Sequence, residues 1–392
     1  MAAMMIGARR GGRWPVRVSV LAAALLAVTG AGCFRQPLEP FTLDSPPAVL
    51  VPAAHAGIVD ERARFREVWC AVRDDHGKDL PEDRPCEDAL LRLAGEAAPS
   101  GLPVSLTSGP GPLRVVVVPG AYGECFRHLA DVFSDGLAHL ATHGYRTETI
   151  QVGGRSSSQH NAVQVRDAVL GMTLAPGERL LLVGYSKGAV DVLEALARHP
   201  EIAPRVAAMV SVAGAINGSP LADGLRDFYV TVAEKLPLRG CEDTGGGLFR
   251  SLRRAERLAF LASATLPPSV RYFSLAGFAE GAGTSRLLEP MRRKLARLDP
   301  RNDGQLLWTD TVIPGATLLG YVRADHWAIA MPFSRTSAAL TATVIDRNAF
   351  PREVLLEAVV RTVEESLRAG RSGVEGPRSA RPRESGQARR RT

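Results

Sequence analysis

A serine between two glycines is the residue of this chain whose type and spacing most clearly predict chemistry. In Gly184-Tyr-Ser186-Lys-Gly188 a glycine lies two residues to either side of the serine, between the apolar run 180–183 and a helical stretch at 189–198. On such a strand-to-helix turn the serine is strained, and the glycines keep crossing segments from clashing. The helix N-terminus favours developing negative charge, which predicts Ser186 as a nucleophile. The alternative is an ordinary connection with an incidental serine.

A serine hydroxyl is a weak nucleophile at neutral pH and needs a base, which in turn needs an orienting acid. Only two histidines follow Ser186, namely His199 and His326. His199 ends the helix after the serine and is expected to point away from it. His326 comes soon after the strand-like stretch Ala316-Thr-Leu-Leu-Gly-Tyr-Val322. Elimination and position therefore predict His326 as the base.

The acid that would orient His326 has three candidates. Asp303 stands in the turn sequence Asn302-Asp-Gly304, on a loop 23 residues before His326. Asp310, in Trp308-Thr-Asp310, is its rival. Asp325 adjoins the histidine and is not expected to fold back onto the ring. Position favours Asp303 and leaves Asp310 open.

An oxyanion would need two backbone N–H donors near Ser186. One is expected from Lys187, the residue after the nucleophile, and the other from the loop Pro119-Gly-Ala121-Tyr-Gly123, where Ala121 is the predicted donor. The Lys187 side chain is expected to pair with Asp191 at i+4. Attraction of anionic substrates is the other interpretation of this lysine.

Apolar runs alternate with helical stretches through the middle of the chain. Leu113-Arg-Val-Val-Val-Val118 is typical of a strand buried on both faces. Further strands are expected at 145–152, 180–183 and 206–213, and helices at 124–142, 160–171 and 189–198. This alternation predicts an α/β fold with a mostly parallel central sheet and helices on both faces.

From Leu113 to Pro332 the chain resembles the α/β-hydrolase superfamily and, within it, bacterial lipases and related serine esterases. The resemblance is carried by Pro119-Gly-Ala121, the Gly184-to-Gly188 turn, the strand-like Val270-Arg-Tyr-Phe-Ser274, Asn302-Asp-Gly304 and His326. In that family the aspartate of the Asn-Asp-Gly turn is the triad acid, which supports Asp303.

The resemblance implies hydrolysis of carboxylic esters, of small molecules or lipids, through a Ser-His-Asp triad and an acyl-enzyme, with no cofactor. An acyltransferase would use the same residues. A catalytically silent lipoprotein that keeps the fold as a binding or assembly module is the non-enzymatic alternative. Related lipases often hold calcium with an acidic residue soon after the histidine, but Trp327-Ala-Ile-Ala330 follows here. Calcium is therefore not expected.

An insertion at about 218–267 interrupts the alternation and is expected to form a helical cap. It contains the helix-like stretches Leu221–Leu236 and Leu248–Ala264. Such a cap would gate and shape an acyl pocket. A structural excursion that never moves is the alternative.

The two ends of the chain predict export and anchoring. Residues 1–33 carry arginines, an apolar run and small residues that lead to Cys33, which resembles a lipoprotein signal with Cys33 as the lipidated residue. Simple signal cleavage with a periplasmic or secreted product is the alternative. Residues 34–57 are a proline-rich tether, 58–112 a small helical extension with predicted helices at 61–72 and 87–95, 113–369 the hydrolase-like domain and 370–392 a disordered basic tail.

Charge and cysteines limit the remaining possibilities. The net charge of +7 comes from the two ends, which leave the body slightly acidic, so no nucleic-acid partner is expected. Export permits disulfides, and the body holds Cys70, Cys86, Cys125 and Cys241. A local Cys70–Cys86 bond is predicted, with Cys125–Cys241 as the second pair and free thiols as the alternative. No CxxC or His-x-His spacing occurs, so no metal site is expected.

Overall fold

The computed structural model describes residues 57–106, 111–225 and 246–372. Four predicted features lie outside the described residues: the signal segment with Cys33, nearly all of the tether, Cys241, and the tail from 373 onward. Among the described helices, none is long and apolar enough to span a bilayer.

The core of the molecule is a sheet of seven parallel strands in the order β1-β7-β6-β5-β4-β2-β3. The strands are β1 (Val59–Asp60), β2 (Leu113–Val118), β3 (Arg146–Thr149), β4 (Arg179–Tyr185), β5 (Val206–Val212), β6 (Arg271–Gly277) and β7 (Thr317–Val322). This arrangement confirms the predicted α/β fold class.

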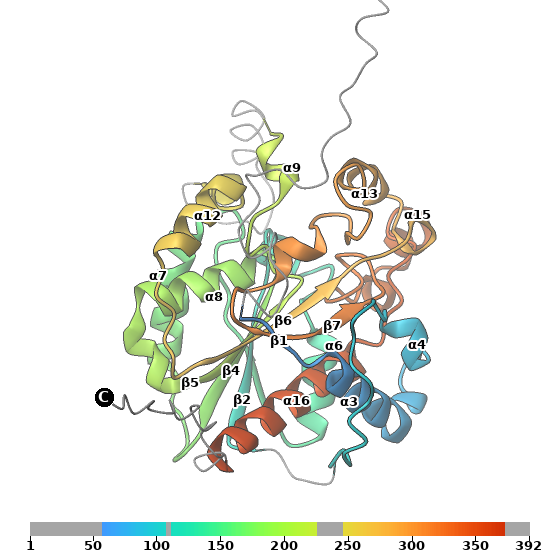
Figure 1. The fold of residues 1–392 in the computed structure, drawn as a ribbon. Coiled ribbons are helices and arrows are strands. Elements are labelled where there is room, and N and C mark those ends of the chain that lie inside the picture. The colour runs from blue at the N-terminus through green and yellow to red at the C-terminus, as the bar shows by residue number, and fades with distance from the viewer. Residues whose placement is uncertain (1–56, 107–110, 226–245, 373–392) are drawn as a thin grey trace, which may run out of the picture.

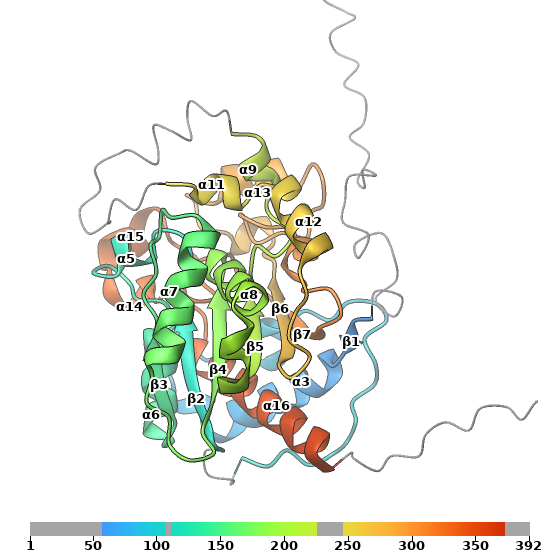
Figure 2. The ribbon, with the colours of Figure 1, turned by 90° about the vertical axis from the view of Figure 1, so that its left-hand side faces the viewer.

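Helices cover both faces of the sheet (Figures 1 and 2). One face carries α3 (Arg62–Asp75), α6 (Ser134–Thr142) and α16 (Arg352–Ser372), and the other carries α7 (Ser158–Gly171) and α8 (Lys187–Arg198). The side chains of β2 alternate between the two cores: Val115 and Val117 pack with the first group, and Val116 and Val118 with the second. Because both faces are apolar, the strand is an unbroken valine run.

The N-terminal region contributes a strand as well as helices to the main fold. Val59 pairs with Thr317 and Asp60 with Leu318 at the edge of the sheet, and Phe65 and Trp69 of α3 are fully buried in the main core. The described residues of the stretch 58–112 therefore share their core with the domain that follows. The predicted helix at 87–95 is wrong, because only α4 (Cys86–Ala89) forms. Leu90 then bridges Val322, and the chain runs along the sheet edge.

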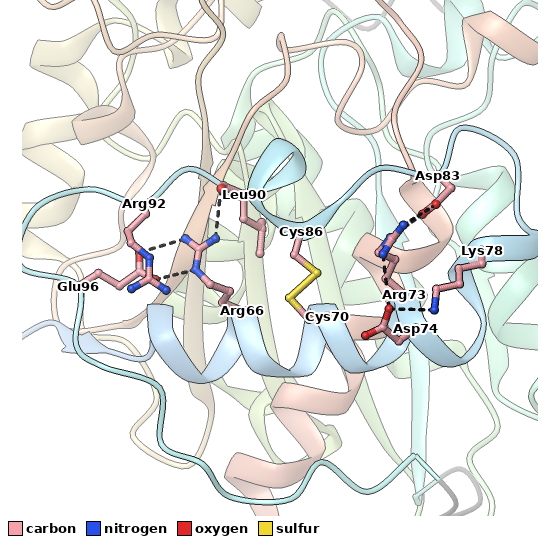
Figure 3. Close-up of a disulfide and its surroundings, with 10 residues drawn as sticks. All are labelled: Arg66, Cys70, Arg73, Asp74, Lys78, Asp83, Cys86, Leu90, Arg92 and Glu96. Carbon is pink, nitrogen blue, oxygen red and sulfur yellow. Dashed lines mark hydrogen bonds and ion pairs between the residues drawn. A yellow bond between two sulfur atoms is a disulfide. The ribbon is translucent and has the colours of Figure 1, made fainter.

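A disulfide joins Cys70 of α3 to Cys86 at the start of α4, as predicted, with a Cα–Cα distance of 5.6 Å (Figure 3). On the same side of α3, Arg66 bonds to Glu96 at 2.8 Å and to the carbonyl of Leu90 at 3.2 Å. Cys125 is also disulfide-bonded. The predicted Cys125–Cys241 pairing is not described, because Cys241 lies outside the described residues.

The single helix predicted at 124–142 is wrong and is replaced by α5 (Gly123–Phe126) and α6. The helix is interrupted over residues 127–133. Phe133, directly before α6, has a left-handed φ of 54°, and its side chain is fully buried. Its N–H donates to the carbonyl of Ala330 at 2.8 Å. Burial of this aromatic ring and a bond to a distant loop outweigh the local helical preference.

The described part of the insertion consists of α9 (Pro220–Asp223), α11 (Leu248–Ser251) and α12 (Arg254–Ser263). The predicted helix at 248–264 breaks at Arg253, which is extended because the carbonyl of Leu252 accepts the N–H of Ser219 at 2.9 Å. The α12 helix packs toward α8, where Arg257 bonds to Glu194 at 2.7 Å. Most of the helix predicted at 221–236 lies outside the described residues.

Candidate active site

Ser186 occupies a sharp turn between β4 and α8. Its φ of 54° and ψ of −124° lie outside the region that non-glycine residues favour. A Cβ on Gly184 would come within 2.4 Å of Ala189 Cα, and one on Gly188 within 2.2 Å of the carbonyl oxygen of Val118. Only glycine fits at these two positions, as the motif predicts, and the turn holds the serine at the end of the strand.

Sheet topology places Ser186 at a switch point. Strands β2 and β4 are neighbours, and the crossover after β2 leads to β3 on one side whereas the crossover after β4 leads to β5 on the other. Ligands of open α/β sheets bind beyond the carboxyl ends of the strands at such points. The loop after β2 meets the serine there: a Cβ on Gly120 would lie 2.8 Å from Ser186 Cβ. A glycine is therefore needed for this close approach.

Three predicted side chains form one hydrogen-bonded chain. His326 Nε2 lies 2.9 Å from Ser186 Oγ, and His326 Nδ1 lies 2.6 Å from Asp303 Oδ2. His326 is 2% exposed and Asp303 fully buried, whereas Ser186 is partly exposed. The imidazole thus links an accessible hydroxyl to a carboxylate that water does not reach.

The loop around Asp303 fixes which of its oxygens faces the histidine. Oδ1 accepts the N–H groups of Gln305 at 2.8 Å and Leu306 at 2.7 Å, and the turn has Gly304 at a φ of +96°. The N–H of His326 donates to the Asp303 carbonyl at 2.8 Å. One oxygen is held by the backbone, and Oδ2 is left for the imidazole.

The other two aspartates have different partners. Asp310, in the short turn η5 (Trp308–Thr311), pairs with Arg254 of α12 at 3.0 Å, and burial raises the pKa of its carboxyl to about 7. Asp325 accepts the N–H groups of Ser285 at 2.8 Å and Ala328 at 2.9 Å, and burial raises its pKa as well. Neither is hydrogen-bonded to His326.

Two supporting residues were not predicted. The hydroxyl of Tyr185 donates to the carbonyl of His326 at 2.7 Å, so the residue before the serine also positions the histidine. Glu124 accepts the N–H of Gly154 at 2.7 Å, while the carbonyl of Gly154 accepts the N–H of Tyr122. These contacts hold the loop after β2. Their partners are distant in sequence, and only the position of Tyr185 inside the glycine–serine motif could have marked it.

The predicted oxyanion donors flank Ser186. Lys187 is the first residue of α8, where a backbone N–H has no acceptor within the helix. Gly123 N–H donates to the carbonyl of Gly120 at 3.1 Å, which closes a turn with Ala121 at its first corner, and Gly120 in this turn lies beside the serine. Both N–H groups belong to chain segments that meet at Ser186.

The side chain of Lys187 points away from the serine and into the α7–α8 interface. Its ammonium lies 2.7 and 2.9 Å from the two carboxylate oxygens of Asp191, and Asn161 donates to the same carboxylate at 2.7 Å. Lys187 and Asp191 are each 1% exposed. The expected i,i+4 pair is therefore present and buried.

Comparison with known proteins identifies the fold family. No protein-family model and no curated protein matches the chain. A metagenomic carboxyl esterase of known structure shares 46% sequence identity with it, over 82% of this chain and 97% of the esterase, with a TM-score of 0.78. The chain belongs to the α/β-hydrolase superfamily.

Two more distant solved structures are also similar to the chain. A lipase of Bacillus licheniformis in its mature form is 23% identical, covering 62% of this hydrolase and 93% of the lipase, with a TM-score of 0.45. The RedJ thioesterase of the prodiginine pathway in Streptomyces coelicolor is 17% identical, covering 68% of this hydrolase and 97% of the thioesterase, with a TM-score of 0.32.

Proposed function

We propose that this hydrolase cleaves carboxylic esters with Ser186 as nucleophile, His326 as base and Asp303 as the orienting acid. The observation that carries the proposal is the unbroken hydrogen-bonded chain from Ser186 Oγ through the imidazole to a buried carboxylate. The relationship to a carboxyl esterase at 46% identity supports ester bonds as the class of bond broken.

The first half of the reaction forms an acyl-enzyme. Ser186 Oγ attacks the ester carbonyl while His326 Nε2 takes the hydroxyl proton, and Asp303 stabilises the imidazolium through Nδ1. In this proposal the N–H groups of Ala121 and Lys187 bind the oxyanion of the tetrahedral intermediate. When the intermediate collapses, His326 gives its proton to the leaving alcohol, and the acyl group stays on the serine.

The second half releases the acid. Water attacks the acyl carbonyl and loses a proton to His326 Nε2, and the same two N–H groups bind the new oxyanion. Collapse expels Ser186 Oγ, which regains its proton from the imidazolium. The residues that act here require no cofactor.

Hydrolysis of p-nitrophenyl esters from acetate to palmitate tests this proposal. We expect turnover by the wild type and a loss of about 10⁶-fold in Ser186→Ala, with unchanged circular dichroism. Ser263→Ala, a substitution of an exposed serine on α12, is the matched control and should keep full activity. The optimum chain length measures the acyl pocket.

Labelling with a fluorophosphonate probe separates the enzymatic proposal from its alternatives. Only an activated serine reacts quickly, so the wild type and Ser263→Ala should be labelled and Ser186→Ala should not. A wild type without turnover on any ester and without labelling would favour a binding module. Transfer of the acyl group to an added alcohol in preference to water would identify an acyltransferase.

A further inference from the structure

A second cluster of titratable side chains lies outside the candidate active site. It consists of His76, His139, His143 and Glu357, each of which offers one ligand atom, and these four atoms lie within 4.8 Å of one another. His139 and Glu357 are buried, and His76 and His143 are partly exposed. We propose that this cluster binds a divalent transition-metal ion of the zinc type in a structural site.

The donor set is one that such ions prefer. Imidazole nitrogens and carboxylate oxygens bind Zn²⁺ at about 2.0–2.2 Å, and a tetrahedral site therefore separates its ligand atoms by about 3.3 Å. Here Glu357 Oε2 lies 2.9 Å from His76 Nδ1 and 2.7 Å from His139 Nε2. Those two contacts are slightly shorter than a zinc site requires, and small side-chain rotations would open them.

Outer contacts orient several of the ligands as metal sites require. His76 Nε2 lies 3.2 Å from the carboxylate of Asp75, and the free oxygen of Glu357, Oε1, accepts from Arg361 at 3.3 Å. Histidine ligands typically donate their second ring nitrogen to a carboxylate or a backbone carbonyl, which fixes the ring. The pattern accounts for both nitrogens of His76 and both oxygens of Glu357.

In the hydrogen-bonded network of the cluster, His143 uses only one of its two ring nitrogens. Its Nδ1 lies 3.0 Å from the carbonyl of His139, so Nδ1 carries the proton and Nε2 holds a lone pair. In the part of the chain that the structure describes, no hydrogen bond to this Nε2 occurs. Its ring centroid lies 4.4 Å from that of His76 and 4.5 Å from that of His139. A metal ion would bind the lone pair of His143 Nε2, which accepts no hydrogen bond in the network.

The position of the cluster indicates a structural role. His76 follows α3, His139 and His143 lie on and just after α6, and Glu357 lies on α16, so the ion would join three helices on one face of the sheet. The α6 helix leads into the start of β3, whereas Ser186 follows the end of β4, at the opposite edge of the parallel sheet. Four protein ligands also leave no open position for substrate.

The sequence signal is the i,i+4 pair His139-Leu-Ala-Thr-His143, which places two imidazoles on one helix face. This spacing is neither CxxC nor His-x-His, the two patterns on which the expectation of no metal site rests. His76 and Glu357 could not have been assigned, because the fold brings them together from positions 281 residues apart.

Metal content of the purified protein tests the inference. After incubation with Zn²⁺ and gel filtration, we expect about one zinc per chain by mass spectrometry, and a rise in melting temperature with added Zn²⁺. His143→Ala and Glu357→Gln should lose the bound zinc and the shift. His160→Ala, which removes an exposed histidine of α7, is the matched control and should retain both.

Substitution of the buried Glu357 could unfold the chain, but His143 is partly exposed and its substitution should leave the fold intact. Co²⁺ should give the intense visible bands of tetrahedral coordination in the wild type and lose them in folded His143→Ala. Wild type that keeps no zinc, or no more than His143→Ala, overturns the inference. So does X-ray absorption that shows zinc bound mainly by oxygen, which would indicate adventitious surface binding.

Discussion

At the residue scale, the candidate acids differ in which of their oxygens are already engaged. Both carboxylate oxygens of Asp325 accept hydrogen bonds from backbone N–H groups, those of its own loop and of Ser285. Asp310 pairs with Arg254. Asp303 engages one oxygen with two N–H groups and offers the other to His326. A carboxylate that holds its own turn in this way orients the imidazole without moving when the imidazole becomes charged.

Substitution of the two rival aspartates should therefore separate their roles. Asp303→Asn is expected to lower kcat by about 10⁴-fold, because an amide stabilises the wrong imidazole tautomer and not the imidazolium. Asp310→Asn should leave kcat within a few-fold of wild type. The measurement is steady-state hydrolysis of a p-nitrophenyl ester. A severe loss in Asp310→Asn with near-normal Asp303→Asn would reverse the assignment.

A single methyl group at Gly120 should also disable the site. Gly120→Ala places a Cβ 2.8 Å from Ser186 Cβ and 3.2 Å from the Tyr185 carbonyl, so the serine or the loop must shift. Misplacement by about 1 Å costs on the order of 10²-fold in rate, and kcat/KM should fall by at least that much.

Gly171→Ala is the matched control for this substitution, because a Cβ there meets nothing within 4 Å at the end of α7. It should keep full activity and unfold at the same or a slightly higher urea concentration. Equal activity in the two variants would mean that the loop after β2 does not approach the nucleophile during the reaction.

At the element scale, a buried ion pair within α8 also receives a hydrogen bond from α7 and so links the two helices. Lys187 and Asp191 lie on α8, and Asn161 of α7 bonds to the same carboxylate. Burial raises the pKa of Asp191, and the Lys187 ammonium opposes this. The pair therefore needs both members, because either charge alone would be left buried.

Lys187→Met should destabilise the fold by about 3–5 kcal/mol, because it leaves the Asp191 carboxylate without its counter-charge. The double variant Lys187→Met/Asp191→Leu should lose much less than the sum of the single changes. Urea unfolding of the wild type, Lys187→Met, Asp191→Leu and the double variant gives the coupling free energy between the two side chains. If Lys187 instead served to attract anionic substrates, Lys187→Met would keep the stability of the wild type and lose kcat/KM only on anionic esters.

Burial of the Asp310 carboxyl should make stability depend on pH. Burial raises the pKa of Asp310 from 3.8 to about 7, so the folded state holds this proton more tightly than the unfolded chain. The resulting stability is full below about pH 4 and is lost as pH rises through 7, with a total on the order of 4 kcal/mol.

Urea unfolding between pH 4 and 8 measures this contribution as the difference between wild type and Asp310→Asn. The wild type should lose stability relative to the variant as pH rises toward 7. Arg254→Gln should extend the loss to higher pH, because the guanidinium lowers the pKa of the buried Asp310 carboxyl and its removal lets that pKa rise further. Parallel curves for wild type and Asp310→Asn would show that Asp310 is ionised throughout this range.

At the scale of the whole molecule, the sequence predicts what is set by local pattern. Strands buried on both faces are apolar at nearly every position, so β2, β4 and β5 are visible as nearly continuous apolar runs. Ser186 is marked by a turn that only glycine neighbours permit, and Asp303 by its Asn-Asp-Gly sequence. Each of these features depends on residues within a few positions of one another.

Features that depend on distant contacts could not be predicted from such patterns. Strand β1 is two residues long and exists because it pairs with β7. Phe133 breaks a helix because its ring and N–H find partners in the core and at Ala330. Tyr185 supports His326 across 141 positions of sequence. In each case the decisive partner is fixed only once the sheet has formed.

The attachment of the whole molecule remains a proposal from the sequence: export and lipidation at Cys33, which lies outside the described residues. Export would place the chain in an oxidising compartment, where a disulfide such as Cys70–Cys86 can form and persist. In cells fed an alkyne fatty acid, the wild type should be labelled and sediment with membranes, because lipid on Cys33 would be its main anchor. Cys33→Ser should lose the label and become soluble, whereas deletion of the basic residues 373–392 should leave both properties intact. Release from membranes by that deletion would instead assign the attachment to the tail, and an unlabelled wild type with a new N-terminus other than Cys33 would indicate simple signal cleavage.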